Sequence, residues 1–233
     1  WVKRFKNKLF MRKCAIKVVL VIKLLALLTV IHSCLENHGC LQDGDLLFCI
    51  AENSAMSEAI VDATRTEKSL QYDHVAIYTR INDIPSVIEA NPKYGVVCRP
   101  LSEFLKDTPD INDKKGVTVM RVMKPMDIYA AIERAKQFIG QPYDWSYRPY
   151  NGKMYCSELI YDCYLDNEGI PVFKASPMNF RNKEGDIPSF WSELFNKIGE
   201  EVPEGIPGTN PNDMFCEPIL NEINCNFASN SID

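Results

Sequence analysis

The amino-acid sequence predicts an α+β fold in which an antiparallel sheet packs against helices. The 233 residues are 46% hydrophobic, which is enough for a globular domain with a substantial core. Strand-like and helical stretches come in blocks instead of alternating strictly, a pattern that favours antiparallel over parallel pairing. Turn-forming pairs such as Asn82 and Asp83 separate successive β-rich runs, so these runs are expected to form hairpins.

Residues 1–34 have the composition of an export signal. They hold eight of the 26 Lys and Arg residues and no acid, and an apolar run covers residues 18–31. The run ends in Ile-His-Ser followed by Cys34, which resembles a bacterial lipoprotein cleavage box with Cys34 as the acylated residue. Lys23 interrupts the run, which is also short for a bilayer span of ~20 residues, so cleavage is expected instead of a permanent anchor. A signal-anchor helix and plain secretion are the alternatives.

The remaining chain, residues 35–233, is expected to be one domain, exported to the periplasm of a bacterium or held at the membrane by a lipid on Cys34. Without residues 1–34 the chain has 18 basic and 31 acidic residues, a net charge of -13. Such an acidic domain is a poor candidate for binding nucleic acid, which needs a basic face.

Cysteine and histidine usage argues against a metal cofactor. The nine cysteines include no Cys-x-x-Cys pair, and His74 is the only histidine in the body of the chain, so no metal site is predicted. In an exported protein several cysteines could form disulfides, although the sequence does not determine the pairing. These cysteines are Cys40, Cys49, Cys98, Cys163, Cys216 and Cys225.

The first half of the domain is predicted to consist of strands around one helix. A turn at residues 42–45 precedes the apolar run 46–50, which reads as a buried strand. Residues 54–63 carry alanines and an isoleucine at helical spacing. Three β-rich runs follow, separated by turn residues: 73–78, 84–90 and 94–98.

The second half begins with a short helix, a strand and an amphipathic helix, over residues 100–106, 116–122 and 127–138. Four helix-breaking residues follow, namely Gly140, Pro142, Pro149 and Gly152. A helical pattern then starts abruptly at Cys156. Beyond Gly169 the chain is rich in Pro and Asn, with one more helix predicted around residues 190–195 and a loop over residues 205–211.

Cys156 is a candidate nucleophile because of its place at the first turn of the predicted helix. Unpaired N–H groups and the positive end of the helix dipole favour a thiolate there. The simpler alternative is a buried structural cysteine, which is common. Cys163, two turns along the same face, is expected to be such a core residue, and Glu158 is expected to place a favourable charge at the helix start.

His74 and Glu89 would complete a catalytic site. A thiol nucleophile needs a base, and the base needs a third group to orient it. His74 opens a predicted strand, and Glu89 lies among apolar residues of the next strand, so the hairpin should place them roughly opposite each other. A buried glutamate is costly unless it is paired, and an imidazolium would pair with it. Separately each residue has an ordinary structural explanation, but together those explanations require three coincidences.

These residues resemble a known family. Gly44-Asp45-Leu46-Leu47-Phe48, His74-Val75-Ala76-Ile77-Tyr78 and Glu89 resemble the strand half of NlpC-type papain-like cysteine hydrolases, and Cys156-Ser157 resembles the start of their catalytic helix. The cysteine follows the strands here, which is the circularly permuted order and is most similar to the YiiX/YaeF-like amidase group. The resemblance covers roughly residues 41–220.

The resemblance implies a papain-like fold, a Cys156-His74-Glu89 triad and hydrolysis of amide or peptide bonds through an acyl-enzyme, without a cofactor. Tyr143 and Tyr155, beside the catalytic helix, are the candidate substrate-binding residues. Export makes cell-wall peptides the leading substrate class. However, Glu89, Tyr155 and Glu158 depart from the unpermuted enzymes, which calls their γ-glutamyl-diamino acid substrate into question.

Two alternatives remain open at this point. The first is a lipid acyltransferase or esterase on the same fold, which should show a continuous apolar surface beside the cleft; Phe190, Trp191 and Phe195 could supply it. The second is a non-catalytic binding module that has kept the cleft.

Overall fold

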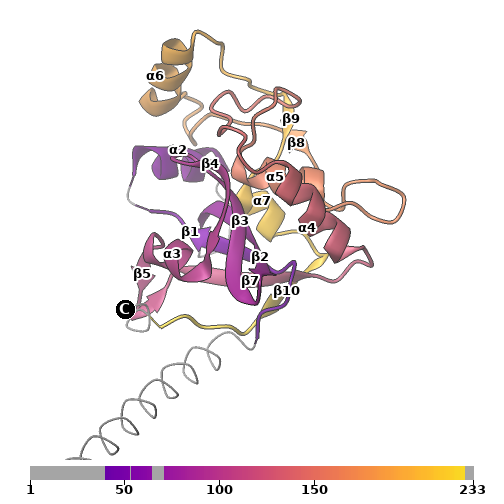
Figure 1. Cartoon of the computed structure of the whole chain (residues 1–233). Coiled ribbons are helices and arrows are strands. Elements are labelled where there is room, and N and C mark those ends of the chain that lie inside the picture. The colour runs from indigo at the N-terminus through magenta and orange to yellow at the C-terminus, as the bar shows by residue number, and fades with distance from the viewer. Residues whose placement is uncertain (1–39, 53, 65–70, 229–233) are drawn as a thin grey trace, which may run out of the picture. The chain divides into compact units, whose positions relative to one another are not determined.

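A computed structural model describes residues 40–52, 54–64 and 71–228 (Figure 1). The chain from Leu41 onward forms one compact unit, which contains every element described below. The predicted export signal and Cys34 lie outside the described residues. No helix in the described part is both long enough and apolar enough to cross a membrane.

The centre of this unit is an antiparallel sheet, which within the described residues has six strands in the order β10-β7-β1-β2-β3-β4. These strands are β1 (Leu46–Ile50), β2 (Tyr72–Ile81), β3 (Ile84–Asn91), β4 (Gly95–Pro100), β7 (Val117–Val122) and β10 (Leu220–Ile223). Every neighbouring pair is antiparallel, so the predicted α+β class is confirmed. The strands β1 to β4 follow the predicted runs closely, and hairpins connect β2 to β3 and β3 to β4.

The turn between β2 and β3 shows why this hairpin is readable from the sequence. Asn82 and Asp83 have φ angles of 51° and 64°, the left-handed conformation that both central residues of a type I′ turn require. Asn and Asp tolerate this conformation better than most residues. The turn sets the register, in which Ile81 pairs with Ile84 and Ile77 with Ile88.

Both faces of the central strands are buried, and they carry different chemistry. Side chains alternate between faces along a strand. Phe48, Val75 and Ile88 point into the main hydrophobic core, whereas the alternate positions include His74 and Glu89. The polar residues therefore share one face of the sheet, near the end where β2 begins.

The helices surround this sheet (Figure 1). They are α2 (Ala55–Thr64), α3 (Leu101–Lys106), α4 (Ile128–Gln137), α5 (Cys156–Cys163), α6 (Ser189–Ile198) and α7 (Pro211–Phe215). The sequence signal for α4 includes its cap, since the Asp127 carboxylate accepts a hydrogen bond from the Ala130 N–H at 3.0 Å. Arg134 of α4 then donates to the Cys163 carbonyl oxygen at the end of α5, which ties the two helices together.

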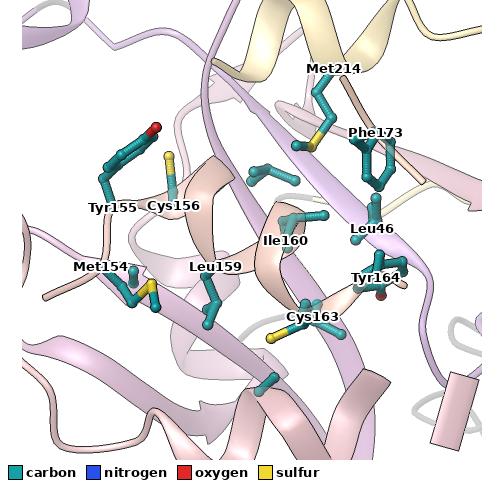
Figure 2. Packing of buried hydrophobic residues seen from close by; sticks show 14 of the residues in the cluster. Leu46, Met154, Tyr155, Cys156, Leu159, Ile160, Cys163, Tyr164, Phe173 and Met214 are labelled. Atoms are coloured by element: carbon teal, nitrogen blue, oxygen red, sulfur yellow. The ribbon is translucent and has the colours of Figure 1, made fainter. Parts of the chain in front are cut away.

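Helix α5 is anchored in the core by its apolar side (Figure 2). Leu159, Ile160 and Cys163 are fully buried, and the core around them contains Leu46 and Met214. Burial raises the pKa of the Cys163 thiol to about 12, with a smaller contribution from Asp162. Cys163 is therefore an inert core residue, as expected.

The C-terminal third differs most from the prediction. The stretch 205–211, predicted as loop, contains β9 (Pro207–Gly208), which pairs with β8 (Ser176–Pro177), and the start of α7. Strand β10 was not predicted either. In the middle of the chain, the small sheet of β5 (Asp110–Ile111) and β6 (Lys114–Lys115) is also unpredicted. Pro and Gly normally disfavour strands, so only tertiary pairing creates β8 and β9.

The cysteines of the described part fall into two groups. Cys40 and Cys225 are each disulfide-bonded. The other five are free thiols: Cys49, Cys98, Cys156, Cys163 and Cys216. Of the six cysteines considered for disulfides, Cys49, Cys98, Cys163 and Cys216 are therefore not used in this way.

Candidate active site

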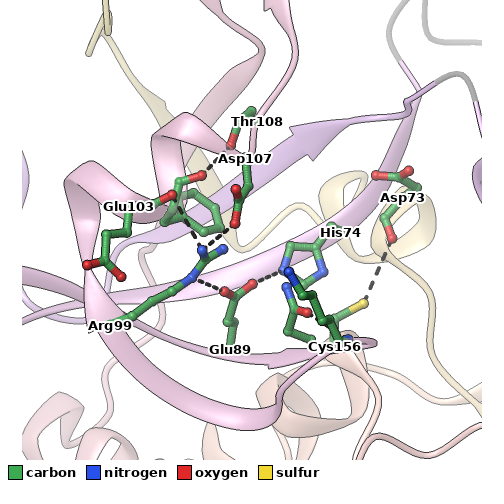
Figure 3. Close-up of polar contacts among 11 residues, drawn as sticks. Asp73, His74, Glu89, Arg99, Glu103, Asp107, Thr108 and Cys156 are labelled. Carbon is green, nitrogen blue, oxygen red and sulfur yellow. Dashed lines mark hydrogen bonds and ion pairs between the residues drawn. The ribbon is translucent and has the colours of Figure 1, made fainter. Parts of the chain in front are cut away.

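Cys156 is the first residue of α5, as the helix-breaking residues before it predict. The preceding Tyr155 is extended, with φ -99° and ψ 168°, so the helix has no turn before Cys156. Cys156 is buried, with only 4% of its surface exposed. Its Sγ atom lies 3.9 Å from the carbonyl oxygen of Asp73 (Figure 3). The thiol thus sits beside the first residues of β2, where His74 begins the polar face.

His74 lies between the thiol and Glu89. Its Nε2 atom is 2.6 Å from Oε2 of Glu89, and Cys156 is close enough to influence its pKa. Burial lowers the pKa of His74, but the neighbouring Cys156 and Glu89 outweigh burial and hold that pKa well above its ordinary value. The imidazolium form is therefore favoured at neutral pH. Since Nε2 is engaged by Glu89, Nδ1 is the nitrogen left for the thiol.

Glu89 is completely buried and has two charged partners. Its Oε2 atom bonds His74, and its Oε1 atom accepts from Nε of Arg99 at 2.6 Å. Burial raises the pKa of Glu89, but His74 and Arg99 together overcome this effect, so the pKa lies below its usual value and the carboxylate stays ionised. The buried acid Glu89 is therefore paired with the imidazole of His74, as expected.

The relative position of His74 and Glu89 differs from the prediction in one respect. The two residues were expected to lie roughly opposite each other. The register pairs Ile77 with Ile88, and continuing it places Glu89 opposite Ala76. His74 is two residues away and on the same face, which is the diagonal neighbour relation that long side chains can still bridge.

Arg99 is a site residue that the sequence reading missed. It lies on β4, where Val97 pairs with Glu89, so Arg99 is again the diagonal neighbour on the same face. Its side chain is 12% exposed and also forms an ion pair with Asp107 after α3 (Figure 3). The sequence does hold a signal for Arg99. It is a basic residue near the end of a predicted strand, two positions after Val97, which pairs with Glu89.

Asp73 is a second residue that the sequence did not single out, and it immediately precedes His74. Its carboxylate accepts hydrogen bonds from the hydroxyl of Ser57 and from the Glu52 N–H. Burial raises its pKa, while the hydrogen bond from Ser57 acts in the opposite direction. Asp73 lies on β2, its carboxylate bonds Ser57 of α2, and its backbone carbonyl contacts Cys156 of α5. It therefore links these three elements.

Two cavities meet at this site. The aromatic cavity, of about 200 Å³, is lined by Cys156 and by Tyr147, Tyr155, Met178, Phe180 and Trp191 among others. The charged cavity, of about 290 Å³, is lined by His74 and Glu89 and by Glu52, Lys93, Arg99 and Asp107 among others. Ile60, Asp73 and Tyr143 line both.

The two tyrosines predicted to bind substrate both lie at these cavities. Tyr143 is at the junction between them, and Tyr155 lines the aromatic cavity. The Tyr155 hydroxyl accepts a hydrogen bond from the Thr209 N–H at 3.1 Å, which connects the start of α5 to the C-terminal segment. Burial raises the pKa of both phenols, so both remain neutral donors at neutral pH.

Two acids near the helix start have structural roles. Asp144 accepts hydrogen bonds from Ser146 and from the Arg148 N–H, which hold the loop before α5. Glu158 accepts from the Tyr155 N–H at 3.3 Å. However, burial raises the pKa of Glu158 to about 8, with further increments from Asp144 and Asp162. The expected negative charge at the helix start is therefore largely absent at neutral pH, because the carboxyl group is buried near other acids.

Two comparisons show known proteins that are similar to this chain in sequence or in structure. An uncharacterized protein of Escherichia coli K12, YiiX, is 27% identical over 187 residues, which are 78% of this chain and 85% of YiiX. A crystal structure described as that of the metalloprotein YiiX from Escherichia coli O157:H7 matches with a TM-score of 0.60 at 25% identity. The match covers 78% of this chain and 95% of that one.

The word metalloprotein describes that crystal structure. Within the described ranges, no three His, Cys, Asp or Glu side chains come together as a metal site. His74 and Glu89 are bonded to each other, and Glu89 is also paired with Arg99.

Residues 40–224 match the model of one protein family, the permuted papain-like amidase enzymes of the YaeF/YiiX group, called peptidase family C92. The match spans most of the chain and includes Cys156, His74 and Glu89. It supports an activity of the cysteine-hydrolase type and agrees with the resemblance noted in the sequence. The chain therefore belongs to the family of permuted papain-like amidases.

Proposed function

We propose that this protein is a cysteine amidase that cleaves amide or peptide bonds with Cys156 as nucleophile, His74 as acid and base, and Glu89 as the group that orients and charges the imidazole. The observation that carries the proposal is the position of His74, which is hydrogen-bonded to a fully buried, ionised Glu89 and has its pKa raised by the neighbouring Cys156. A structural cysteine would not need a buried ion pair behind a neighbouring histidine.

The reaction follows from these positions. The Cys156 thiolate attacks the amide carbonyl carbon, and the oxyanion forms near the unpaired backbone N–H groups at the start of α5. His74 gives its proton to the leaving nitrogen as the C–N bond breaks, which leaves a thioester on Cys156. Water then attacks the thioester while His74 accepts its proton, and the acid is released with the thiol regenerated.

Export, which we also propose from residues 1–34, would bring the enzyme to peptides of the bacterial cell wall as well as to other amides. The full chain should be incubated with cell-wall peptides, amino-acid amides and acyl lipids, and the products identified by mass spectrometry. We expect amide cleavage by the wild type and none by Cys156→Ala. Equal product formation by both proteins would exclude Cys156 as the nucleophile, and binding without turnover would favour a binding module.

A lipid acyltransferase or esterase is the second candidate, because the aromatic cavity beside Cys156 supplies apolar surface. Trp191 lines this cavity, whereas Phe195 is buried in the core behind it. Paired substrates with one acyl group and either an ester or an amide bond separate the two activities. Cleavage of the ester alone would favour the second candidate.

A further inference from the structure

A third cavity, of about 230 Å³, lies along one side of α5, between this helix, the loop before it and the β8–β9 pair. We call it the acidic cavity. Its lining includes the acids Glu158 and Asp162, the tyrosines Tyr150, Tyr155 and Tyr161, and Thr209. It shares Tyr155 and Thr209 with the aromatic cavity, but no member of the proposed triad belongs to its described lining. The acidic cavity is therefore a separate place for a ligand.

The acidic cavity holds carboxyl groups without a matching cation. Glu158 and Asp162 are one turn apart on α5, and Glu158 is only 6% exposed. The described lining contains no Lys, Arg or His. Burial raises the pKa of both carboxyl groups, nearby acids add to this effect at Glu158, and no described cation opposes it. The described protein thus leaves the ionised forms of these two acids without compensation.

Two polar atoms of this lining also lack hydrogen-bond partners. Glu158 accepts from the Tyr155 N–H through Oε2, while its Oε1 atom bonds no described residue. Oγ1 of Thr209 is buried and likewise has no partner in the described part of the chain. Buried polar groups are normally hydrogen-bonded, so a donor is missing on this side of α5. A ligand with a positive charge and N–H groups would supply what the lining lacks.

The three tyrosines favour the same kind of ligand. Tyr155 is buried, Tyr161 is half-buried and Tyr150 is exposed, so their rings offer apolar surface at different depths. The face of an aromatic ring attracts a cation, and the ring also covers an alkyl chain. An anionic ligand would instead meet two acids. A cation on an alkyl chain is therefore the ligand that fits the charge, the hydrogen bonding and the apolar surface together.

We propose that the acidic cavity binds a primary ammonium group on an alkyl chain, in which the ammonium pairs with Glu158 and the chain packs on the tyrosine rings. A free alkylamine and the side chain of a lysine both present this chemistry. The site is independent of the proposed amidase function, since no step of that reaction involves its acids.

A set of matched ligands tests the requirement for a cation. Calorimetry with the full-length protein at about pH 8 compares pentylamine, the lysine derivative Nα-acetyl-lysine amide, and pentanol, which has the same chain without the charge. We expect at least one of the two ammonium compounds to bind about tenfold or more tightly than pentanol. The tighter of the two identifies a free amine or a lysine side chain as the source. Pentanol binding as tightly as both overturns the proposal.

A pair of variants tests the place of binding. Glu158→Gln keeps the size of the side chain but removes its charge, and should weaken binding of the preferred ammonium compound about tenfold. Glu193→Gln makes the same change on an exposed position of α6, outside the acidic cavity, and should have no effect. Urea unfolding verifies that both variants are folded. Ammonium binding that Glu158→Gln leaves unchanged would place the cation elsewhere and overturn the proposal.

The pH dependence of binding gives a second, independent readout. The groups that raise the pKa of Glu158 to about 8, besides burial, are Asp144 in the preceding loop and Asp162 on α5. An alkylammonium stays charged up to about pH 10, so Glu158 is the partner that must lose a proton. Affinity should therefore increase as the pH rises toward 8, and binding at neutral pH should release protons, measured by calorimetry in buffers of different ionisation enthalpy. Affinity that is constant over this range, with no proton release, would exclude pairing with Glu158.

Discussion

At the scale of single residues, the site depends on charges that are stable only because each has a partner. Glu89 is fully buried, yet it remains ionised because His74 and Arg99 each bond one of its oxygens. His74 is 18% exposed in its side chain and stays protonated because Cys156 and Glu89 surround it. Removing any one charge should therefore change the protonation of the others.

The first prediction concerns the reactivity of Cys156. Because Cys156 and Glu89 favour the charged form of His74, an imidazolium should lie beside the thiol. Iodoacetamide should therefore label Cys156 rapidly even at mildly acidic pH, and His74→Ala should remove most of this reaction. Peptide mapping of labelled cysteines from about pH 5 to 10 checks this. Cys163 should stay unlabelled in both proteins. An ordinary thiol profile that His74→Ala does not alter would exclude an activated nucleophile.

The second prediction concerns Glu89→Gln. The substitution keeps the size of the side chain but removes the negative charge that raises the pKa of His74. The imidazolium should then lose its proton at a lower pH, so the alkaline limb of the kcat/KM profile should move toward neutral pH. The rate should fall by less than it does in Cys156→Ala. An unchanged pH profile would show that Glu89 does not control the charge of His74.

At the scale of elements, the site is built across three strands and one helix start. Strands β2, β3 and β4 place His74, Glu89 and Arg99 diagonally on one face. Helix α5 brings Cys156 to the end of this row, and its own start depends on the contact between Tyr155 and Glu158. The sheet therefore positions the proposed base, and the helix positions the proposed nucleophile.

The third prediction concerns the stability of α5. The pKa of Glu158 is raised from about 4.5 in the unfolded chain to about 8 in the folded protein. The folded state therefore binds more protons than the unfolded state, and Glu158 increasingly destabilises the fold as the pH rises from 4.5 to 8. Glu158→Gln should match the wild type near the lower pH and exceed its unfolding free energy by about 1–3 kcal/mol at the upper one.

Urea unfolding at several pH values measures this difference. The carboxamide still provides an oxygen for the Tyr155 N–H, so the cap itself is retained. Glu193→Gln, on an exposed position of α6, is the matched control and should show no pH-dependent gain. A constant offset at all pH values would show that the effect arises from packing and not from ionisation.

At the scale of the whole molecule, the described unit contains the proposed active site, and residues 1–34 carry the proposed export signal. Their basic start, apolar run and Cys34 motivate the fourth prediction. The full-length protein expressed in a bacterium should fractionate with membranes, and Cys34→Ala should lose its lipid label. A soluble wild type without acylation at Cys34 would replace the lipoprotein proposal with plain secretion.

The sequence by itself determined the local features of this protein. The hairpin at Asn82 and Asp83, the abrupt start of α5 at Cys156 and the buried acid at position 89 all follow from patterns within a few residues. Such patterns reflect backbone conformations and the alternation of buried side chains, which depend mainly on near neighbours in the chain.

Only the tertiary structure decided how these features meet. Cys156 and Asp73 are 83 residues apart, and the diagonal offset of His74 from Glu89 depends on the register of the hairpin. The part played by Arg99, the neutral state of Glu158 and the contrast between the two cavities depend on distances and burial across several elements. A single sequence does not contain these quantities in any local pattern, because the electrostatic free energy of a side chain depends on all groups that fold around it.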